Sequence, residues 1–166
     1  MASPSPGFDT SRVSPSDANV TVRSLPRRFA EAFDRADSPD DLVRRPPEGG
    51  LSPLEHAAWT AEALEAIGSA LGRVLVAGDP QVELPPVNPP GATGGGGGDP
   101  AAVLARLGDA ARSLADAMAD GHGQDWSRTG RTPSGNVSAL DIARLAVRIG
   151  VEHLRAAEEE LKPRRG

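Results

Sequence analysis

Arg148 and Glu152 have the types and spacing for chemistry within the stretch LAVRIGVEHLRAAEEEL. They are four positions apart, so on a helix their side chains lie on one face and can meet. A guanidinium there would orient a carboxylate, enolate or phosphate, and Glu152 would act as a base or hydrogen-bond acceptor. We predict both as catalytic residues. The alternative is a solvated ion pair that contributes less than about 1 kcal/mol.

A second group of candidates lies in LSPLEHAAWTAEAL. Trp59 is a candidate pocket wall that would stack on a flat ligand or a cation, and Glu62 would line the same rim. His56 is a further candidate ligand-binding residue. Each has a simpler alternative: Trp59 fills space, Glu62 faces solvent, and His56 is a buried or edge histidine.

The chain has few side chains that bind metals or act as nucleophiles. It contains no cysteine, which excludes disulfides, thiolate zinc sites and a cysteine nucleophile. Its three histidines, His56, His122 and His153, include no pair four positions apart. We expect His122 to lie in a loop and His153 to pack inside or face solvent, and we interpret the glutamates at 158–160 as a solvated helix end.

Helices are expected to position these candidates, because the chain has no Tyr, three Phe and two Trp, and a core of Leu, Ile, Val and Ala suits close-packed helices. Ser52, Pro53 and Glu55 form a cap, a first-turn proline and a capping box, which predicts a helix over 53–76. Three further helices are predicted: one with Ser24 as its cap and Pro26 in its first turn, one from Asp99 and Pro100 to about 120, and one from Ser138 and Asp141 to about 162.

Two regions rich in Gly and Pro are expected to lack regular structure. Residues 1–20 are predicted to form a disordered tail, and residues 78–100 a long crossover between the second and third helices. The glycines at 94–98 lack the Lys and Ser/Thr of a phosphate-binding loop. Residues 121–137 are expected to form a short hairpin or an irregular lid, with Trp126 pinning the turn. The predicted fold is one all-α domain over 21–166, a four-helix bundle.

Charge and hydropathy narrow the range of partners. The net charge is -5 and no basic stripe or polybasic cluster is present, so we expect no nucleic acid and no membrane surface as a partner. No apolar run approaches the roughly 18 residues of a membrane span, and the first twenty residues do not resemble a secretory signal. We therefore expect a cytoplasmic protein with a small-molecule ligand, and a homodimer stays open.

The sequence resembles the DinB/YfiT-like family of four-helix bundles, which includes mycothiol-dependent maleylpyruvate isomerase-like domains and bacterial thiol S-transferases. LSPLEHAAWTAEAL is similar to the second helix, DWSRTGRTPSGNVSALDIARLAVRIGVEHLRAAEEEL to the fourth helix with its preceding turn, and VRSLPRRFAEAFDRA to the first helix. The richness in Ala, Gly, Pro and Arg, taken with this resemblance, suggests an actinobacterial type of protein, active in secondary metabolism.

The resemblance implies a pocket at one end of the bundle where three histidines commonly hold a divalent metal. Matched onto this chain, those positions carry Trp59, Arg148 and Glu152, and a register slip of three residues would place His56 at the first. An indole offers no lone pair to a metal, and an arginine next to the site would repel a cation. We therefore predict no metal and no cofactor.

Three hypotheses follow for function. The first is a metal-free protein that binds a small anionic or flat organic molecule in the bundle pocket and catalyses an isomerisation, cyclisation or transfer. The second is a metal-dependent thiol S-transferase or isomerase of the mycothiol type with a recruited ligand set such as His56, Glu152 and His153. The third is a non-enzymatic dimeric interaction protein.

Overall fold

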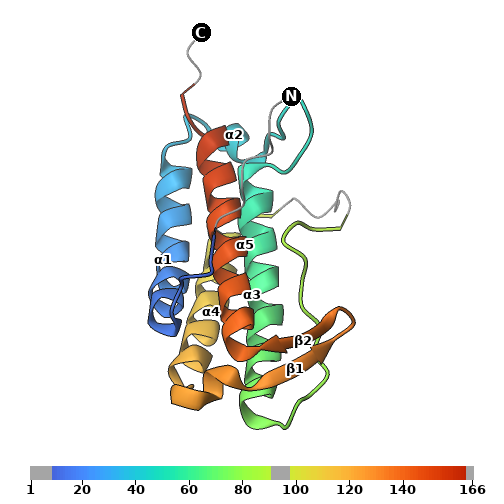
Figure 1. The fold of residues 1–166 in the computed structure, drawn as a ribbon. Coiled ribbons are helices and arrows are strands. Elements are labelled where there is room, and N and C mark those ends of the chain that lie inside the picture. Colours follow the sequence, from blue (N-terminus) through green and yellow to red (C-terminus); the bar gives the residue numbers. More distant parts are fainter. Residues whose placement is uncertain (1–8, 91–97, 164–166) are drawn as a thin grey trace.

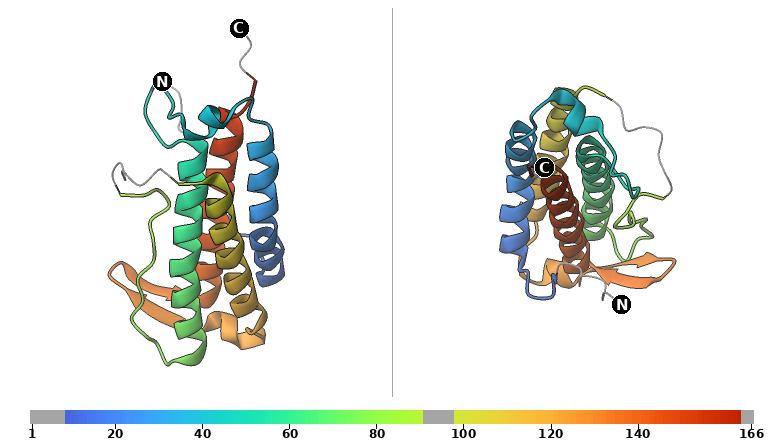
Figure 2. Two further views of the ribbon diagram at one scale, coloured as in Figure 1. Left: turned by 180° about the vertical axis from the view of Figure 1, so that it is seen from behind. Right: turned by 90° about the horizontal axis from the view of Figure 1, so that it is seen from above.

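Four long helices pack side by side in the computed structural model, which describes residues 9–90 and 98–163 (Figure 1). They are α1 (Pro15–Asp34), α3 (Pro53–Val76), α4 (Pro100–Ala119) and α5 (Ala139–Glu160). Both α1 and α3 pack against α4 and α5, so α1 and α3 lie at opposite corners of the bundle (Figure 2). The predicted all-α four-helix bundle is confirmed.

The predicted start of α3 is confirmed at its cap. The Ser52 hydroxyl accepts a hydrogen bond from the Glu55 backbone N–H at 3.1 Å, and the Glu55 carboxylate accepts one from the Ser52 N–H at 3.0 Å. These bonds satisfy donors that a helix start leaves unpaired. α3 then runs from Pro53 to Val76, over the predicted range.

The prediction for the first helix was wrong at its start. α1 begins at Pro15, with Ser14 as its cap and Asp17 completing the capping box, and Pro26 lies inside it. Residues 15–20 therefore belong to the bundle and not to a disordered tail, while residues 1–8 lie outside the described residues. The same cap-and-proline pattern that marks α3 stands at Ser14 and Pro15, and we had assigned it to the more interior Ser24 and Pro26.

A short helix, α2 (Pro39–Val43), connects α1 to α3 at one end of the bundle. At the other end, α4 is followed by the 3-10 helix η1 (Gly123–Ser127) and by strands β1 (Thr129–Thr132) and β2 (Gly135–Ser138). The strands pair antiparallel, with Thr129 opposite Ser138, which confirms the hairpin alternative. Trp126 packs against the core as predicted.

The crossover runs along the outside of α3 and is held by the hairpin (Figure 1). Val82 donates its backbone N–H to Arg131 O at 2.9 Å, and Arg131 donates to Pro80 O at 2.8 Å. Gly130 lies in the same contact, since a Cβ there would be 2.9 Å from Val74 Cγ2. The crossover is thus attached to the bundle on its described part, and the glycines at 94–97 lie outside the described residues.

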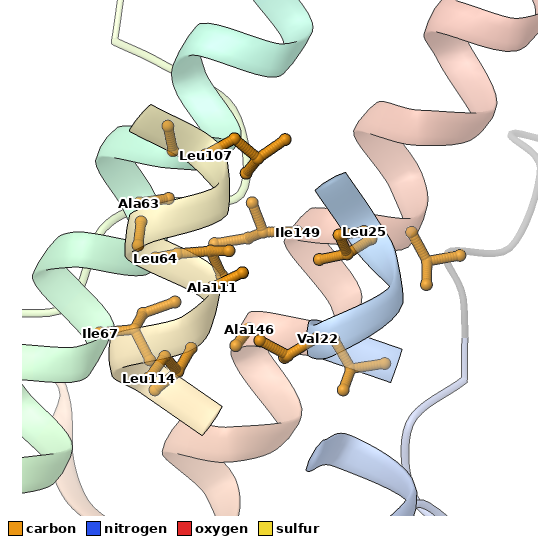
Figure 3. Packing of buried hydrophobic residues seen from close by; sticks show 14 of the residues in the cluster. Val22, Leu25, Ala63, Leu64, Ile67, Leu107, Ala111, Leu114, Ala146 and Ile149 are labelled. Atoms are coloured by element: carbon orange, nitrogen blue, oxygen red, sulfur yellow. The ribbon is translucent and has the colours of Figure 1, made fainter. Parts of the chain in front are cut away.

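The core consists of interleaved side chains from all four long helices, most of them aliphatic, together with Phe29 and Phe33 (Figure 3). Helices α1 and α5 approach each other closely. Leu25 and Ile149 are both fully buried, and Gly150, next to Ile149 in the sequence, has no space for a side chain. A Cβ on Gly150 would overlap Leu25 Cδ1. No described helix is both long enough and apolar enough to cross a membrane.

The buried polar side chains of the described residues gather near one end of this core. They are Ser52, Glu55, His56, Thr60 and His153. Four of them belong to the cap and first two turns of α3, and the fifth lies on α5. Burying polar groups costs free energy unless they are hydrogen-bonded, so this buried polar cluster is a candidate functional site.

Candidate functional site

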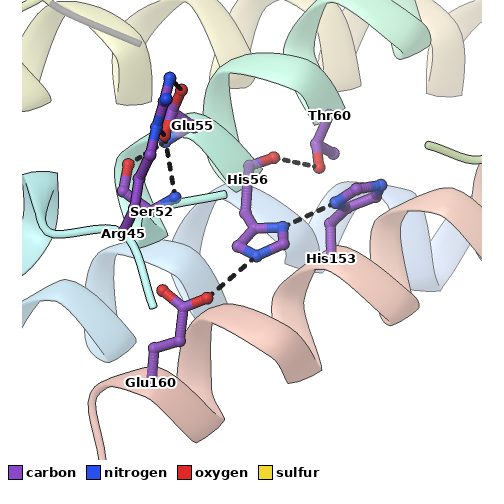
Figure 4. A network of polar contacts seen from close by, with 7 residues as sticks. All are labelled: Arg45, Ser52, Glu55, His56, Thr60, His153 and Glu160. Carbon is purple, nitrogen blue, oxygen red and sulfur yellow. Dashed lines mark hydrogen bonds and ion pairs between the residues drawn. The ribbon is translucent and has the colours of Figure 1, made fainter. Parts of the chain in front are cut away.

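His56 on α3 and His153 on α5 face each other between the two helices (Figure 4). Their Nδ1 atoms are 2.8 Å apart and their ring centroids 5.1 Å apart. His153 is 2% exposed and His56 is 8% exposed. The structure thus brings together two histidines that we had placed in one set only in the alternative metal hypothesis.

The backbone of the crossover fixes the ring of His153. Its Nε2 lies 2.7 Å from the Val87 carbonyl oxygen. Burial lowers the pKa of His153 to about 4, and the positive charge of His56 lowers it further, while the Val87 bond and Glu152 act in the opposite direction. His153 is therefore neutral near pH 7.

The second ring nitrogen of His56 faces a carboxylate from the last turn of α5. His56 Nε2 lies 3.4 Å from Glu160 Oε1, with the side chains 10% and 20% exposed. Glu160 Oε2 is buried without a hydrogen-bond partner in the described part of the chain. We had interpreted 158–160 as a solvated helix end, but Glu160 follows His153 by two helical turns, and this spacing places both on one face.

Trp59 attaches the crossover and is not a bare pocket wall. Its indole N–H donates to the Val87 carbonyl oxygen at 3.0 Å, and the side chain is partly buried against the core. Thr60 lies one turn after His56 on α3, and its hydroxyl donates to the His56 carbonyl oxygen at 2.8 Å. The stacking role that we predicted for Trp59 stays a prediction.

Arg45, which the sequence did not point to, holds the α2–α3 connection against the start of α3. Its Nε and Nη2 donate to Glu55 Oε1 and Oε2 at 2.9 and 2.7 Å, a bidentate pair (Figure 4). The Arg45 hydrogen bonds are the main reason that the pKa of Glu55 falls to about 2, and the Ser52 bonds lower it further. Glu55 is therefore both the cap residue of α3 and the anchor of this connection.

Two hollows open beside the His56–Glu160 contact. The His56 hollow, of about 650 Å³, lies between the α2–α3 connection and the crossover, and is lined by Arg45, Pro46, Pro47, Gly49, Gly50, Leu51, His56, Asn88 and Pro89. The Glu160 hollow, of about 620 Å³, has mostly charged walls that include Arg35, Arg44, Glu159, Glu160 and Lys162. Arg45, Pro46 and Pro47 line both hollows. His56 therefore reaches one hollow and its partner Glu160 the other.

The remaining candidates lie away from these hollows. Arg148 Nε and Glu152 Oε1 are 3.5 Å apart and form the expected ion pair, with the Arg148 side chain 47% exposed. Arg148 lines a different hollow, together with Arg144 and residues 9–11. Glu62 is exposed. The structure does not bring Arg148 to His56, and the catalytic roles assigned to Arg148 and Glu152 stay predictions.

The described residues do not fit the three-histidine metal site that the family resemblance implies. They contain no group of three or more His, Cys, Asp or Glu side chains arranged to hold a metal ion. His56 and His153 supply two nitrogens, but Glu160 faces the opposite side of the His56 ring. Four residues before His153 stands Ile149, fully buried and without a donor atom. A catalytic zinc usually takes three protein ligands, and the two histidine nitrogens fall short of that number.

Comparison with known proteins supports the fold. Residues 21–157 match the model of the DinB superfamily. The structure superposes on YfiT from Bacillus subtilis with a TM-score of 0.76 at 14% identity, covering 96% of this chain and 93% of that chain. YfiT is described as a probable metal-dependent hydrolase with an unusual four-helix bundle topology. No curated protein matches.

Proposed function

The chain belongs to the DinB superfamily, and we propose that it binds a small anionic or flat organic molecule in the His56 hollow without a metal ion. The observation that carries the proposal is the position of His56. Its ring is almost buried, yet it lines a hollow of about 650 Å³, a size typical of small-molecule sites. No other histidine of the described residues lines that hollow.

The walls of the His56 hollow favour an anionic ligand with a flat face. Arg45 lines the hollow, and Glu55 holds its guanidinium in place, so that its flat face can stack on a ring and its charge can attract an anion. Prolines and Leu51 supply apolar surface, and Asn88 adds hydrogen-bonding groups. A ligand seated there lies beside an imidazole that can exchange a proton with it, which suits an isomerisation, a cyclisation or a transfer.

Benzoate and benzamide provide a direct test of binding, because they share a ring and differ in charge. We expect benzoate to shift the His56 ring signals in 1H–13C NMR spectra and to do so more strongly than benzamide. His56→Gln should remove the signals that shift and so assign them to His56, whereas His122→Gln, in the exposed loop, should retain both the signals and their shift. Unchanged His56 signals with both compounds would contradict binding at this hollow.

Metal analysis tests the metal-free part of the proposal. Protein purified without chelators should contain far less than one equivalent of zinc, nickel or another divalent transition metal per chain. One tightly held equivalent would instead favour metal-dependent chemistry of the kind described for YfiT. Benzoate binding that survives dialysis against EDTA would support the proposal further.

A further inference from the structure

The hydrogen bonds around His56 determine where its protons lie. The chain of contacts starts at the Val87 carbonyl oxygen, which can only accept. His153 Nε2, 2.7 Å from that oxygen, must therefore carry a proton. His153 is buried and its pKa is lowered to about 4, so at neutral pH its other nitrogen, Nδ1, is a bare acceptor.

His56 must donate to that acceptor. The two Nδ1 atoms are 2.8 Å apart, and a hydrogen bond at this distance needs one donor and one acceptor. Since His153 Nδ1 has no proton, the proton belongs to His56 Nδ1. A neutral imidazole carries one ring proton, so a neutral His56 would turn a bare Nε2 toward Glu160.

A bare Nε2 facing a carboxylate oxygen at 3.4 Å would place two acceptors against each other. One more proton therefore belongs between His56 and Glu160. The contact of His56 with Glu160 is an ion pair only when His56 holds that proton. We infer that Glu160 is a positioning residue that holds His56 as an imidazolium, with His153 as its neutral partner on the other side.

Other charged groups around this arrangement have ion-pair partners. Arg35, Arg44 and Lys162, which line the Glu160 hollow, pair with Glu158, Asp41 and Glu159. From the α2–α3 side, Arg45 is paired with Glu55. On α5, Glu152 is paired with Arg148. Both pairs combine opposite charges, so the carboxylate of Glu160 is the partner in direct contact with the charge on His56.

This inference, which rests on the proposed function for its chemical use, makes His56 a metal-free general acid. In the transfer step the His56 Nε2–H bond breaks, its electron pair stays on Nε2, and the proton joins an anionic oxygen or carbon of the bound molecule. The Nδ1–H bond to His153 is unchanged, and His56 ends neutral. Glu160, which lines the second hollow, can accept a proton from hydronium or a buffer acid in the solvent and pass it to the bare Nε2, which restores the imidazolium. The ligand class is thus one with a basic atom, such as a carboxylate or an enolate.

Two-bond 1H–15N NMR of the labelled full chain at pH 7 tests the proton order without any ligand. We expect both ring nitrogens of His56 to appear as N–H type, and His153 to show one N–H type nitrogen, Nε2, and one bare nitrogen, Nδ1. Glu160→Gln should convert His56 Nε2 to the bare type. Glu159→Gln, an exposed neighbour paired with Lys162, should leave the pattern of the wild type.

The wild-type spectrum decides the inference even if a variant fails to fold. One bare nitrogen on His56 in the wild type, or a protonated His56 that persists in a folded Glu160→Gln variant, would overturn it. Benzoate titration reports separately on the proposed function. If the nitrogen pattern is as expected but benzoate causes no shift, only the proposed binding is rejected. If benzoate binds but His56 is neutral, only the imidazolium is rejected.

Discussion

Trp59 and His153 donate hydrogen bonds to the same acceptor, the carbonyl oxygen of Val87, at 3.0 and 2.7 Å. The two side chains come from different helices, α3 and α5, so a single backbone oxygen of the crossover binds to both helices. Asn88 and Pro89, which follow Val87 directly, line the His56 hollow. Attachment of the crossover and the shape of the hollow are therefore coupled.

Trp59→Phe should loosen this attachment while retaining most of the packing. The variant keeps an aromatic ring and loses the N–H donor, so we expect a loss of about 1 kcal/mol in the free energy of unfolding. In 1H–15N NMR spectra the amide signals of Val87 and Asn88 should move toward random-coil positions. Trp126→Phe is the matched control, because Trp126 belongs to η1, at the other end of the bundle, and packs against the core there. Unchanged amide signals of Val87 and Asn88 in Trp59→Phe would show that the Trp59 N–H is not needed to hold Val87 in place.

Burial of His153 should make the fold sensitive to mild acid. The pKa of His153 is about 4 in the folded chain and about 6.5 in an unfolded one, so the unfolded chain binds more protons between these values. The contribution of His153 to the free energy of unfolding should therefore be complete above about pH 6.5 and fall as the pH drops toward 4, by up to about 3 kcal/mol. Urea unfolding at pH 7.5, 5.5 and 4.5 would measure the loss.

The pH dependence is assigned to His153 by substitution. His153→Gln retains an amide for hydrogen bonding but does not titrate, and it should flatten the decline between pH 6.5 and 4. His122→Gln, in the exposed loop, should decline as steeply as the wild type. A His153→Gln variant with the full decline would assign the acid sensitivity to other groups.

Glu55 should stabilise the fold in its charged form, whereas His153 does so in its neutral form. Its pKa is lowered to about 2 by Arg45 and Ser52, so the stabilisation is present above the unfolded value near 4.5 and is lost as the pH falls toward 2. Glu55→Gln should cost about 1–2 kcal/mol at pH 7, since solvent screens the half-exposed Arg45, and should remove the part of the pH dependence below 4.5 that comes from Glu55. Chemical unfolding of this variant beside Glu159→Gln would check both effects.

Local signals in the sequence were sufficient for much of the fold. Ser52 with Pro53 and Ser138 with Asp141 located the starts of α3 and α5, because a cap and a first-turn residue act over a few positions. The start of α1 was missed since two Ser–Pro signals compete in that segment, and only packing selects Ser14. Val22, fully buried in the earlier part of the helix, shows that the core needs those extra turns.

The candidate site was harder to predict, because it depends on which helix faces meet. His56 and His153 are 97 positions apart, and helical periodicity does not say that these two faces oppose each other. The resemblance directed attention to Trp59, Arg148 and Glu152. His56 lies three residues before Trp59 on α3, and His153 lies one residue after Glu152 on α5. Tertiary packing decides such small differences in register.

The space around two helical glycines, Gly150 and Gly72, predicts whether alanine at each position lowers or raises the free energy of unfolding. A Cβ on Gly150 would overlap the fully buried Leu25, and overpacking of this kind costs about 1–3 kcal/mol. Gly72, inside α3, has nothing within 4 Å of its built Cβ, so Gly72→Ala should gain up to about 1 kcal/mol from the higher helix propensity of alanine. Thermal unfolding of the two variants should move in opposite directions. A neutral Gly150→Ala would mean that α1 can move away from α5 at little cost, and the tight packing of this bundle would then not extend to the α1–α5 interface.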